Sequence, residues 1–203
     1  MATPIGHALA GYAVYQLRPV ATSEGGRERA LLWLCVSMAI APDLDFLPGM
    51  LQGHPNLYHQ GISHSIGAAC VVSGLTAVLL GLRNGVVWSE WGLLFLAYAS
   101  HLAVDFWGPD SRPPYGQPLF WPVSGAYYLA PTPILMGVRH AKNVAATPGE
   151  WIAGVLHPQN LAAVGVEILV MAPVILLTRS VRRLRLALQG RERDGGEKPR
   201  RVA

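Results

Sequence analysis

Apolar side chains in this chain gather into five runs, separated by stretches rich in Pro, Gly or charge. The run from Ile66 to Leu82 makes ~25 Å of helix, just enough to cross a thin bilayer. The last run is interrupted only by Glu167 and Pro173. We therefore expect about five membrane-spanning helices, although the first run is short enough to leave its crossing open. The runs cover residues 4–17, 30–41, 66–82, 91–107 and 161–178.

The segments outside these runs predict a loop region and a tail. Residues 108–160 are rich in Pro and Gly, which indicates a structured loop with short interfacial helices. The end of the chain is rich in Gly and charge, which is typical of disorder. We expect one membrane-embedded domain over residues 1–185 and a basic, disordered tail over residues 186–203.

Composition supports a membrane protein. Of the 203 residues, 51% are hydrophobic and 14% are charged, with a mean hydropathy of +0.30. Soluble domains carry about 25% charged residues. The predicted fold class is an all-α integral membrane bundle. Cys35 and Cys70 lie within apolar runs, so we expect both to be small buried side chains. The N-terminus lacks a basic signal-peptide region, and we expect it to be retained.

Basic residues are concentrated near the end of the chain, where residues 179–201 include nine Arg or Lys and only three Asp or Glu. Because this segment follows an apolar run, it favours a cytoplasmic position near anionic lipid over binding of nucleic acid. With five spans, the other basic loops fall on the same side, so residues 46–65 and 108–160 face outwards. This pattern predicts a multi-pass protein of a bacterial-type inner membrane. The nine residues are Arg179, Arg182, Arg183, Arg185, Arg191, Arg193, Lys198, Arg200 and Arg201.

Four short segments place His or Asp within or against apolar sequence. An Asp at the centre of a spanning helix costs ~2.5–3.5 kcal/mol, so such residues usually have a function and a partner. The expected topology brings all four segments to the outer end, provided that the first run crosses the membrane. The segments are His7, Pro42-Asp-Leu-Asp45, His59-Gln-Gly-Ile-Ser-His64 and His101-Leu-Ala-Val-Asp105.

The residue types in these segments are those that bind a transition metal. His101 and Asp105 share one helix face, which fits either a metal site or a buried hydrogen-bonded pair. Asp43 and Asp45 point in different directions, so we expect one of them to be a ligand and the other to support it. His59 is either a ligand or a polar loop residue.

Mixed imidazole and carboxylate ligands suit Zn²⁺, with Mn²⁺ or Fe²⁺ as alternatives. Such a site supplies an activated water for hydrolysis. Glu167 either hydrogen-bonds within the bundle or supports the site. We interpret His54, His140 and His157 as surface residues.

The order of these motifs resembles the YdjM-like family of predicted inner-membrane metal-dependent hydrolases. The resemblance covers residues 1–125 and includes the segment Pro118-Leu-Phe-Trp-Pro-Val-Ser124. More distantly, the arrangement is similar to the helical zinc-dependent phospholipase C and P1 nuclease group. That group completes a third zinc site with a His-x-x-x-Glu segment, which this chain lacks after Asp105. One or two metal ions are therefore expected.

The resemblance implies a role for each residue. The first metal would be bound by Asp45 or Asp43, together with His64, His101 and Asp105. Asp105 would bridge to a second metal that His7 also binds. We assign metal binding to His7, Asp45, His64, His101 and Asp105, with His59 as a possible addition. The catalytic candidates are Asp43 and Asp45, the second of which would orient the water as a general base.

These observations favour a membrane-bound metal-dependent hydrolase that cleaves a phosphoester or ester bond of a lipid or lipid-linked substrate. The alternative is a non-catalytic metal-binding membrane protein or an ion transporter. A transport pathway should place polar groups at several depths, whereas the candidates here gather at one end. A third hypothesis is an adaptor that binds DNA or a lipid surface through the basic tail. No specific nucleic acid is expected, and the oligomeric state stays open.

Overall fold

The computed structural model of this protein describes all residues except 20–24, 85–87, 112, 142, 144 and 197–203. Each of the five apolar runs forms a helix, and no strand occurs within these described residues. The five helices are α1 (Pro4–Tyr15), α2 (Gly25–Ile40), α4 (Ile66–Asn84), α5 (Trp88–Phe106) and α7 (Gln159–Gly196). The expectation of an all-α protein is confirmed.

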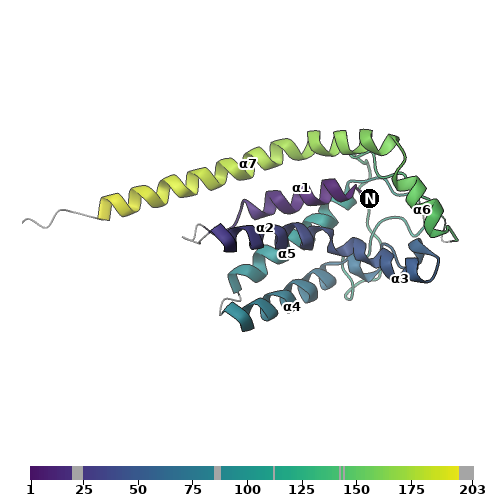
Figure 1. The fold of residues 1–203 in the computed structure, drawn as a ribbon, viewed down its shortest axis with the longest axis horizontal. Helices are drawn as coiled ribbons and strands as arrows, with labels where there is room; N and C mark the ends of the chain where they lie inside the picture. The colour runs from purple at the N-terminus through teal and green to yellow at the C-terminus, as the bar shows by residue number, and fades with distance from the viewer. Residues whose placement is uncertain (20–24, 85–87, 112, 142, 144, 197–203) are drawn as a thin grey trace, which may run out of the picture.

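The five remaining elements are short and lie at one end of the bundle, which we call the loop end (Figure 1). Pro42 interrupts the continuation of α2, because proline lacks the N–H that an α-helix needs, whereas Pro48 lies in the first turn of the next helix, where that N–H is not required. The chain therefore passes through a 3₁₀ turn before it resumes as a short helix. These elements are η1 (Ala41–Asp45), α3 (Phe46–Leu51), η2 (Pro55–Leu57), η3 (Ile62–His64) and α6 (Pro148–Val155).

Helices α1, α2 and α5 pack together as the centre of the bundle, while α4 packs on α5 and α7 packs on α1. Small residues allow these helices to approach closely, as in other membrane bundles. A Cβ atom on Gly11 of α1 would lie 2.7 Å from the carbonyl oxygen of Cys35 in α2. A Cβ atom on Gly6 would lie 2.7 Å from a carboxylate oxygen of Glu167 in α7.

Within the part of the chain that the structure describes, two segments are long and apolar enough to cross a membrane, Glu28–Leu51 and Gln159–Arg191, and Ile66–Gly81 is a shorter apolar helix. Helix α1 has 12 residues, or roughly 18 Å, which is shorter than the ~30 Å hydrocarbon core of a bilayer. The expected number of about five spans is therefore not confirmed.

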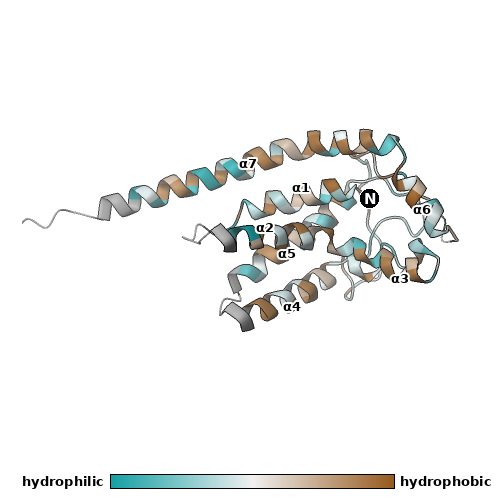
Figure 2. Ribbon diagram, viewed as in Figure 1, coloured by the Kyte–Doolittle hydropathy of each residue, from teal (hydrophilic) through white to brown (hydrophobic). Residues whose placement is uncertain are grey.

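Helix α7 continues to Gly196, beyond residue 186, where we expected disorder to begin. Arg, Leu, Ala and Gln dominate residues 182–189 and are good helix formers, which favours continuation past residue 186. Figure 2 shows α7 as mainly apolar beside the bundle and as a mixture of hydrophilic and apolar residues beyond it. Residues 197–203 of the expected tail lie outside the described residues.

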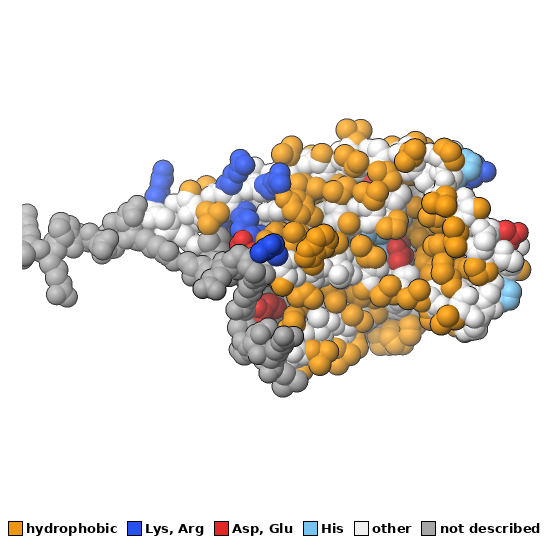
Figure 3. Space-filling view, viewed as in Figure 1, with side chains coloured by type: hydrophobic (Ala, Val, Ile, Leu, Met, Phe, Trp, Pro, Cys, Tyr) orange, Lys and Arg blue, Asp and Glu red, His pale blue; other side chains and the backbone are white. Residues whose placement is uncertain are grey.

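Large apolar side chains are exposed over much of the bundle (Figure 3). On α7, Leu161 and Leu169 are about three-quarters exposed, and Val71 and Leu79 on α4 are similarly open. Exposed apolar surface of this extent marks an interaction with a membrane or another protein. Cys35 is buried as expected, but Cys70 is exposed, because it lies on the outer side of α4.

Candidate metal centre

Four elements carry the His and Asp residues to the loop end. His7 lies in the second turn of α1, and Asp43 lies in η1, directly after α2. His64 ends η3, immediately before α4 begins. His101 and Asp105 lie one turn apart near the end of α5. Residues far apart in the sequence thus meet where these elements start or stop.

Four side-chain atoms converge in this region: Asp43 Oδ1, His64 Nε2, His101 Nε2 and Asp105 Oδ2. The two Nε2 atoms are 3.2 Å apart. Asp43 Oδ1 lies 3.8 Å from His64 Nε2 and 3.6 Å from His101 Nε2. Asp105 Oδ2 lies 3.7 Å and 3.4 Å from the same two atoms.

These separations fit a single metal ion. A tetrahedral ion with ligands at ~2.0–2.1 Å has ligand atoms about 3.3–3.4 Å apart. Asp43 Oδ1 and Asp105 Oδ2 are both buried and have no hydrogen-bond partner among the described residues. Buried carboxylate oxygens without partners are costly. A cation bound between the four atoms would satisfy both of them, so the donor set fits a divalent metal.

Both histidines are oriented from behind. Nδ1 of His101 lies 2.8 Å from the carbonyl oxygen of Ala39, to which it donates when it carries the proton. Nδ1 of His64 lies 3.2 Å from Asp45 Oδ2. A ring nitrogen held in this way fixes the tautomer and leaves Nε2 as the lone-pair atom, which is how metal-binding histidines are commonly supported.

Asp45 lies behind His64, away from the four converging atoms. Its Oδ1 accepts from His59 Nδ1 at 2.9 Å, and its Oδ2 accepts from the Ser63 hydroxyl at 2.7 Å and the Gln60 amide at 3.1 Å. Asp45, His59 and His64 are themselves close enough to share an ion. However, both oxygens of Asp45 already accept hydrogen bonds, so the described contacts fit a supporting carboxylate.

His7 completes the cluster on the opposite side. Its ring stacks on His101 with centroids 3.7 Å apart. Its Nε2 lies 3.3 Å from Asp105 Oδ1 and 3.9 Å from Asp43 Oδ2, the oxygens that point away from the four converging atoms. Neither ring nitrogen has a hydrogen-bond partner among the described residues. His7 therefore offers a further ligand atom beside two carboxylates that could bridge two ions.

The electrostatics of the cluster favour a bound cation. Among the described residues, no Lys or Arg pairs with Asp43, Asp45 or Asp105, and the amino terminus is the nearby cationic group. Burial alone would lower the pKa of His64, but hydrogen bonds with Asp43 and Asp45 raise it to about 10. Burial lowers the pKa of His59, against the hydrogen bond with Asp45. The carboxylates thus attract positive charge towards His64.

Solvent reaches the cluster past one residue. The side chain of Asp43 is 13% exposed, whereas those of His7, His64, His101 and Asp105 are almost fully buried. A cavity of about 490 Å³ with polar and apolar walls opens beside Asp45 and is also lined by His59 and Tyr127.

The structure brings together five of the predicted residues, His7, Asp43, His64, His101 and Asp105. Asp45, the predicted ligand and general base, lies behind His64 and not among the converging atoms. His59 is hydrogen-bonded to Asp45. Of the three histidines expected at the surface, His54 is exposed, whereas His140 and His157 are half-buried. The side chain of His140 packs near Phe46 and Trp151, because α6 folds back over this end of the bundle.

Glu167 belongs to a separate hydrogen-bond group. It is buried in α7, where Oε1 accepts from the Thr3 amide at 2.6 Å and Oε2 accepts from the Thr3 hydroxyl. The Thr3 hydroxyl also accepts from the Gly6 amide and thereby caps α1. Glu167 therefore fixes the start of the helix that carries His7. Sequence analysis left this role open between the bundle and the site.

Comparison with known proteins identifies a family. The model of the YdjM inner membrane protein family matches residues 1–184. No curated protein and no solved structure matches significantly. Because the match covers most of the chain, the protein belongs to this family.

Proposed function

We propose that this member of the YdjM inner membrane protein family is a membrane-bound metal-dependent hydrolase. Its substrate would be a phosphoester or ester of a lipid or lipid-linked molecule. The observation that carries the proposal is the convergence of two imidazole and two carboxylate atoms beside His7, with both carboxylate oxygens lacking other partners. The site would face outwards and the basic end of α7 would lie in the cytoplasm, following the positive-inside rule.

The chain supplies oriented ligands and a protected pocket. Ala39 and Asp45 hold His101 and His64 with Nε2 directed inwards, so little reorganisation is needed on binding. These ligands would suit Zn²⁺ best, and such an ion would polarise the bond to be cleaved and lower the pKa of a bound water to about 7. Asp43 is the partly exposed carboxylate, so it would meet an incoming substrate first.

His7 decides between a catalytic and a purely structural site. Four protein ligands fill the shell of a tetrahedral ion, as in structural zinc sites, whereas catalytic sites keep one position for water. His7 Nε2 lies 3.9 Å from Asp43 Oδ2 and 3.3 Å from Asp105 Oδ1, the oxygen that also accepts from the Ala2 amide at 2.7 Å. These three atoms would hold a second ion and leave such a position. We therefore propose two ions: Asp43, His64, His101 and Asp105 would hold the first, and His7 with the other oxygens of Asp43 and Asp105 would hold the second.

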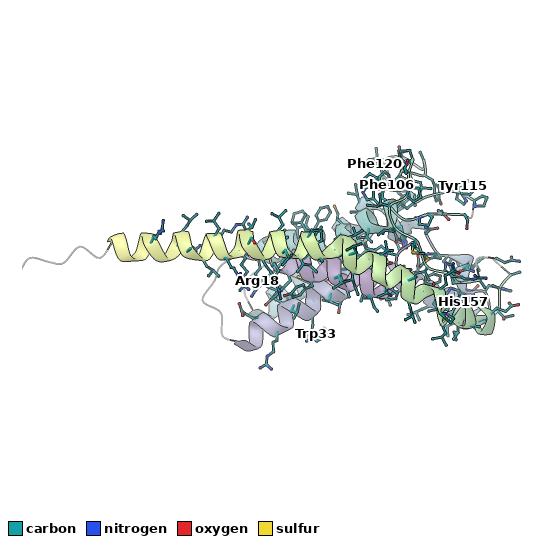
Figure 4. The ribbon with its side chains drawn as sticks, turned by 90° about the horizontal axis from the view of Figure 1, so that it is seen from above. Arg18, Trp33, Phe106, Tyr115, Phe120 and His157 are labelled. Atoms are coloured by element: carbon teal, nitrogen blue, oxygen red, sulfur yellow. The ribbon has the colours of Figure 1, made fainter. Side chains whose placement is uncertain are left out.

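A substrate in the membrane is supported by the aromatic surface of the loop end. Tyr115, Phe120 and Trp121 are 56%, 47% and 38% exposed. Figure 4 places Tyr115 and Phe120 at the end of the molecule opposite the free end of α7, with Arg18 further along the bundle. Aromatic side chains are enriched where lipid headgroups meet the hydrocarbon core. The cluster would then lie at headgroup depth, where phosphoester and ester bonds of lipids are found.

The second candidate function is a non-catalytic metal-binding protein. The four-ligand set favours it, because this set alone closes the shell of one ion. An ion transporter is less well supported, since both carboxylate oxygens of the buried Glu167 already accept hydrogen bonds from Thr3.

The test is to purify the protein in detergent, load it with Zn²⁺ or Mn²⁺, and assay phosphodiester and phospholipid substrates. His101→Ala is compared with His54→Ala, which removes an exposed histidine at the same end. We expect hydrolysis by the wild type and His54→Ala, and loss of both metal and hydrolysis in His101→Ala. Metal binding without hydrolysis across the panel would support the structural role. Equal metal content in both variants would contradict the proposed site.

A further inference from the structure

A second cavity lies away from the metal centre, between α1, α5 and α7. Its volume is about 300 Å³, its exposed wall is apolar, and it is open to the surroundings. Val14 of α1, Val104 of α5 and Val174 of α7 line it. Apolar cavities of this kind hold no ordered water and accept apolar ligands. A membrane protein is surrounded by lipid, so the apolar ligand available to this cavity is a lipid acyl chain.

The length of the cavity matches one leaflet. On α7 its lining runs from Glu167 to Thr178, which is roughly 16 Å along the helix. Half of the ~30 Å hydrocarbon core is about 15 Å. An acyl chain that enters at Thr178 would therefore reach Glu167, which lies level with Thr3 and Gly6 at the start of α1.

Two arginine side chains lie at the end of this cavity that is marked by Thr178. Arg182 and Arg185 follow Thr178 by four and seven residues, so all three share one helix face. Arg185 Nη1 donates to the carbonyl oxygen of Leu17 at 3.2 Å, and Leu17 itself lines the cavity. The guanidinium group is therefore fixed at the opening.

The arginines near the opening of this cavity outnumber the acidic side chains that contact them. Arg18 and Arg182 both contact Glu28, through nitrogen–oxygen distances of 2.8 Å and 3.3 Å. Arg179 bonds only the neutral Tyr12 hydroxyl in its described contacts, and Arg185 bonds a carbonyl oxygen. The buried Nε of Arg182 has no hydrogen-bond partner among the described residues. Each guanidinium has five N–H donors, so donors remain for an anion.

We propose that one anionic phospholipid binds here, with an acyl chain in the cavity between α1, α5 and α7 and its phosphate on Arg182 and Arg185. The lipid fills the gap between α5 and α7, which reaches the rest of the bundle mainly through α1. It therefore holds α7 in place. The charge complementarity of the opening selects an anionic headgroup over a zwitterionic one. This inference is independent of the metal centre.

The experiment uses the full chain, stripped of lipid in a neutral detergent. Phosphatidylglycerol or phosphatidylcholine with the same acyl chains is added, and retained lipid is counted by native mass spectrometry while thermal unfolding is followed. We expect one retained phosphatidylglycerol per protein and a higher Tm, with no such effect of phosphatidylcholine. Equal effects of the two lipids, or an equal shift with inorganic phosphate alone, would overturn the proposal.

Two pairs of variants separate headgroup from chain. Arg182→Gln with Arg185→Gln should weaken phosphatidylglycerol retention roughly 30-fold. The control, Arg183→Gln with Arg191→Gln, removes the same charge from exposed positions of α7 and should retain the lipid. An equal loss in the control would show general attraction to the basic helix.

Val174→Phe fills the cavity and should also prevent retention. Leu177→Phe adds the same ring at a position that is 66% exposed, outside the cavity lining, and should not. Retention by Val174→Phe would contradict an acyl chain in the cavity, whatever the outcome for the arginines.

Discussion

Polar groups are buried on two sides of the α1 segment, and they differ in how well the protein satisfies them. On one side, Thr3 donates its amide and hydroxyl to Glu167, so both carboxylate oxygens have partners. On the other side, His7 faces Asp43 and Asp105, and an oxygen of each carboxylate has no partner among the described residues. A satisfied buried group needs no ligand, whereas an unsatisfied one does. The Thr3–Glu167 contacts therefore have a structural role, whereas the group around His7, only a few residues further along α1, is a candidate binding site.

The largest effect on metal binding should come from removing one of the ligand atoms of the His and Asp cluster. His101→Ala deletes one of four converging atoms, so His64 alone would remain as the imidazole ligand between Asp43 and Asp105. We expect metal affinity to fall by more than about 100-fold, beyond the ~10–100-fold typical of supporting residues. Metal titration of the purified protein measures this. Unchanged affinity would place the metal elsewhere, or nowhere, in the chain.

Substitution of His7 should separate turnover from metal binding. His7→Ala leaves the four converging atoms intact, so we expect one ion to be retained. The proposed second ion should be lost, with hydrolysis reduced roughly 100-fold or more. Metal content and kcat are measured on the same preparation. If metal stoichiometry and activity both match the wild type, His7 has no part in the site.

Asp45→Asn tests the supporting position. The change removes the charge behind His64 but keeps a side chain of the same shape, so His64 loses its anchored orientation. We expect metal affinity to fall about 10–100-fold without complete loss. Isothermal titration measures the shift. A complete loss of metal, equal to that of His101→Ala, would instead make Asp45 a direct ligand, as the sequence predicted.

Removing the contacts between Thr3 and Glu167 should change the stability of the protein but not its metal content. Glu167→Ala leaves the amide and hydroxyl of Thr3 buried without acceptors, which should lower the free energy of unfolding by about 2–4 kcal/mol. Metal stoichiometry in the folded fraction should not change. Thermal unfolding and metal content report the two quantities separately. Loss of metal at unchanged stability would assign Glu167 to the metal centre instead.

The sequence was sufficient to predict the helices and the participants of the cluster, because an ionisable residue within apolar sequence is costly and therefore informative. Ser65, directly before α4, caps this helix by accepting from the Ala68 amide at 3.0 Å, as a serine at a helix start commonly does. These are local properties of spacing and residue type.

What the sequence could not predict depends on how the elements turn in three dimensions. Asp43 and Asp45 are two residues apart, and only the path of the 3₁₀ turn decides which one faces His64 Nε2. The carbonyl oxygen of Ala39 that orients His101 is a backbone atom and leaves no signal in the sequence. Contacts between residues more than 100 positions apart, such as Thr3 with Glu167, also leave no local pattern.

X-ray absorption at the zinc edge of the zinc-loaded protein tests the central claim most directly. The account predicts nitrogen and oxygen ligands at ~2.0–2.2 Å, with the multiple-scattering signature of imidazole. In His101→Ala the imidazole contribution should fall together with the bound zinc, while His54→Ala should match the wild type. Sulfur ligands at ~2.3 Å, or the same spectrum and zinc content in His101→Ala, would contradict a metal centre built from Asp43, His64, His101 and Asp105.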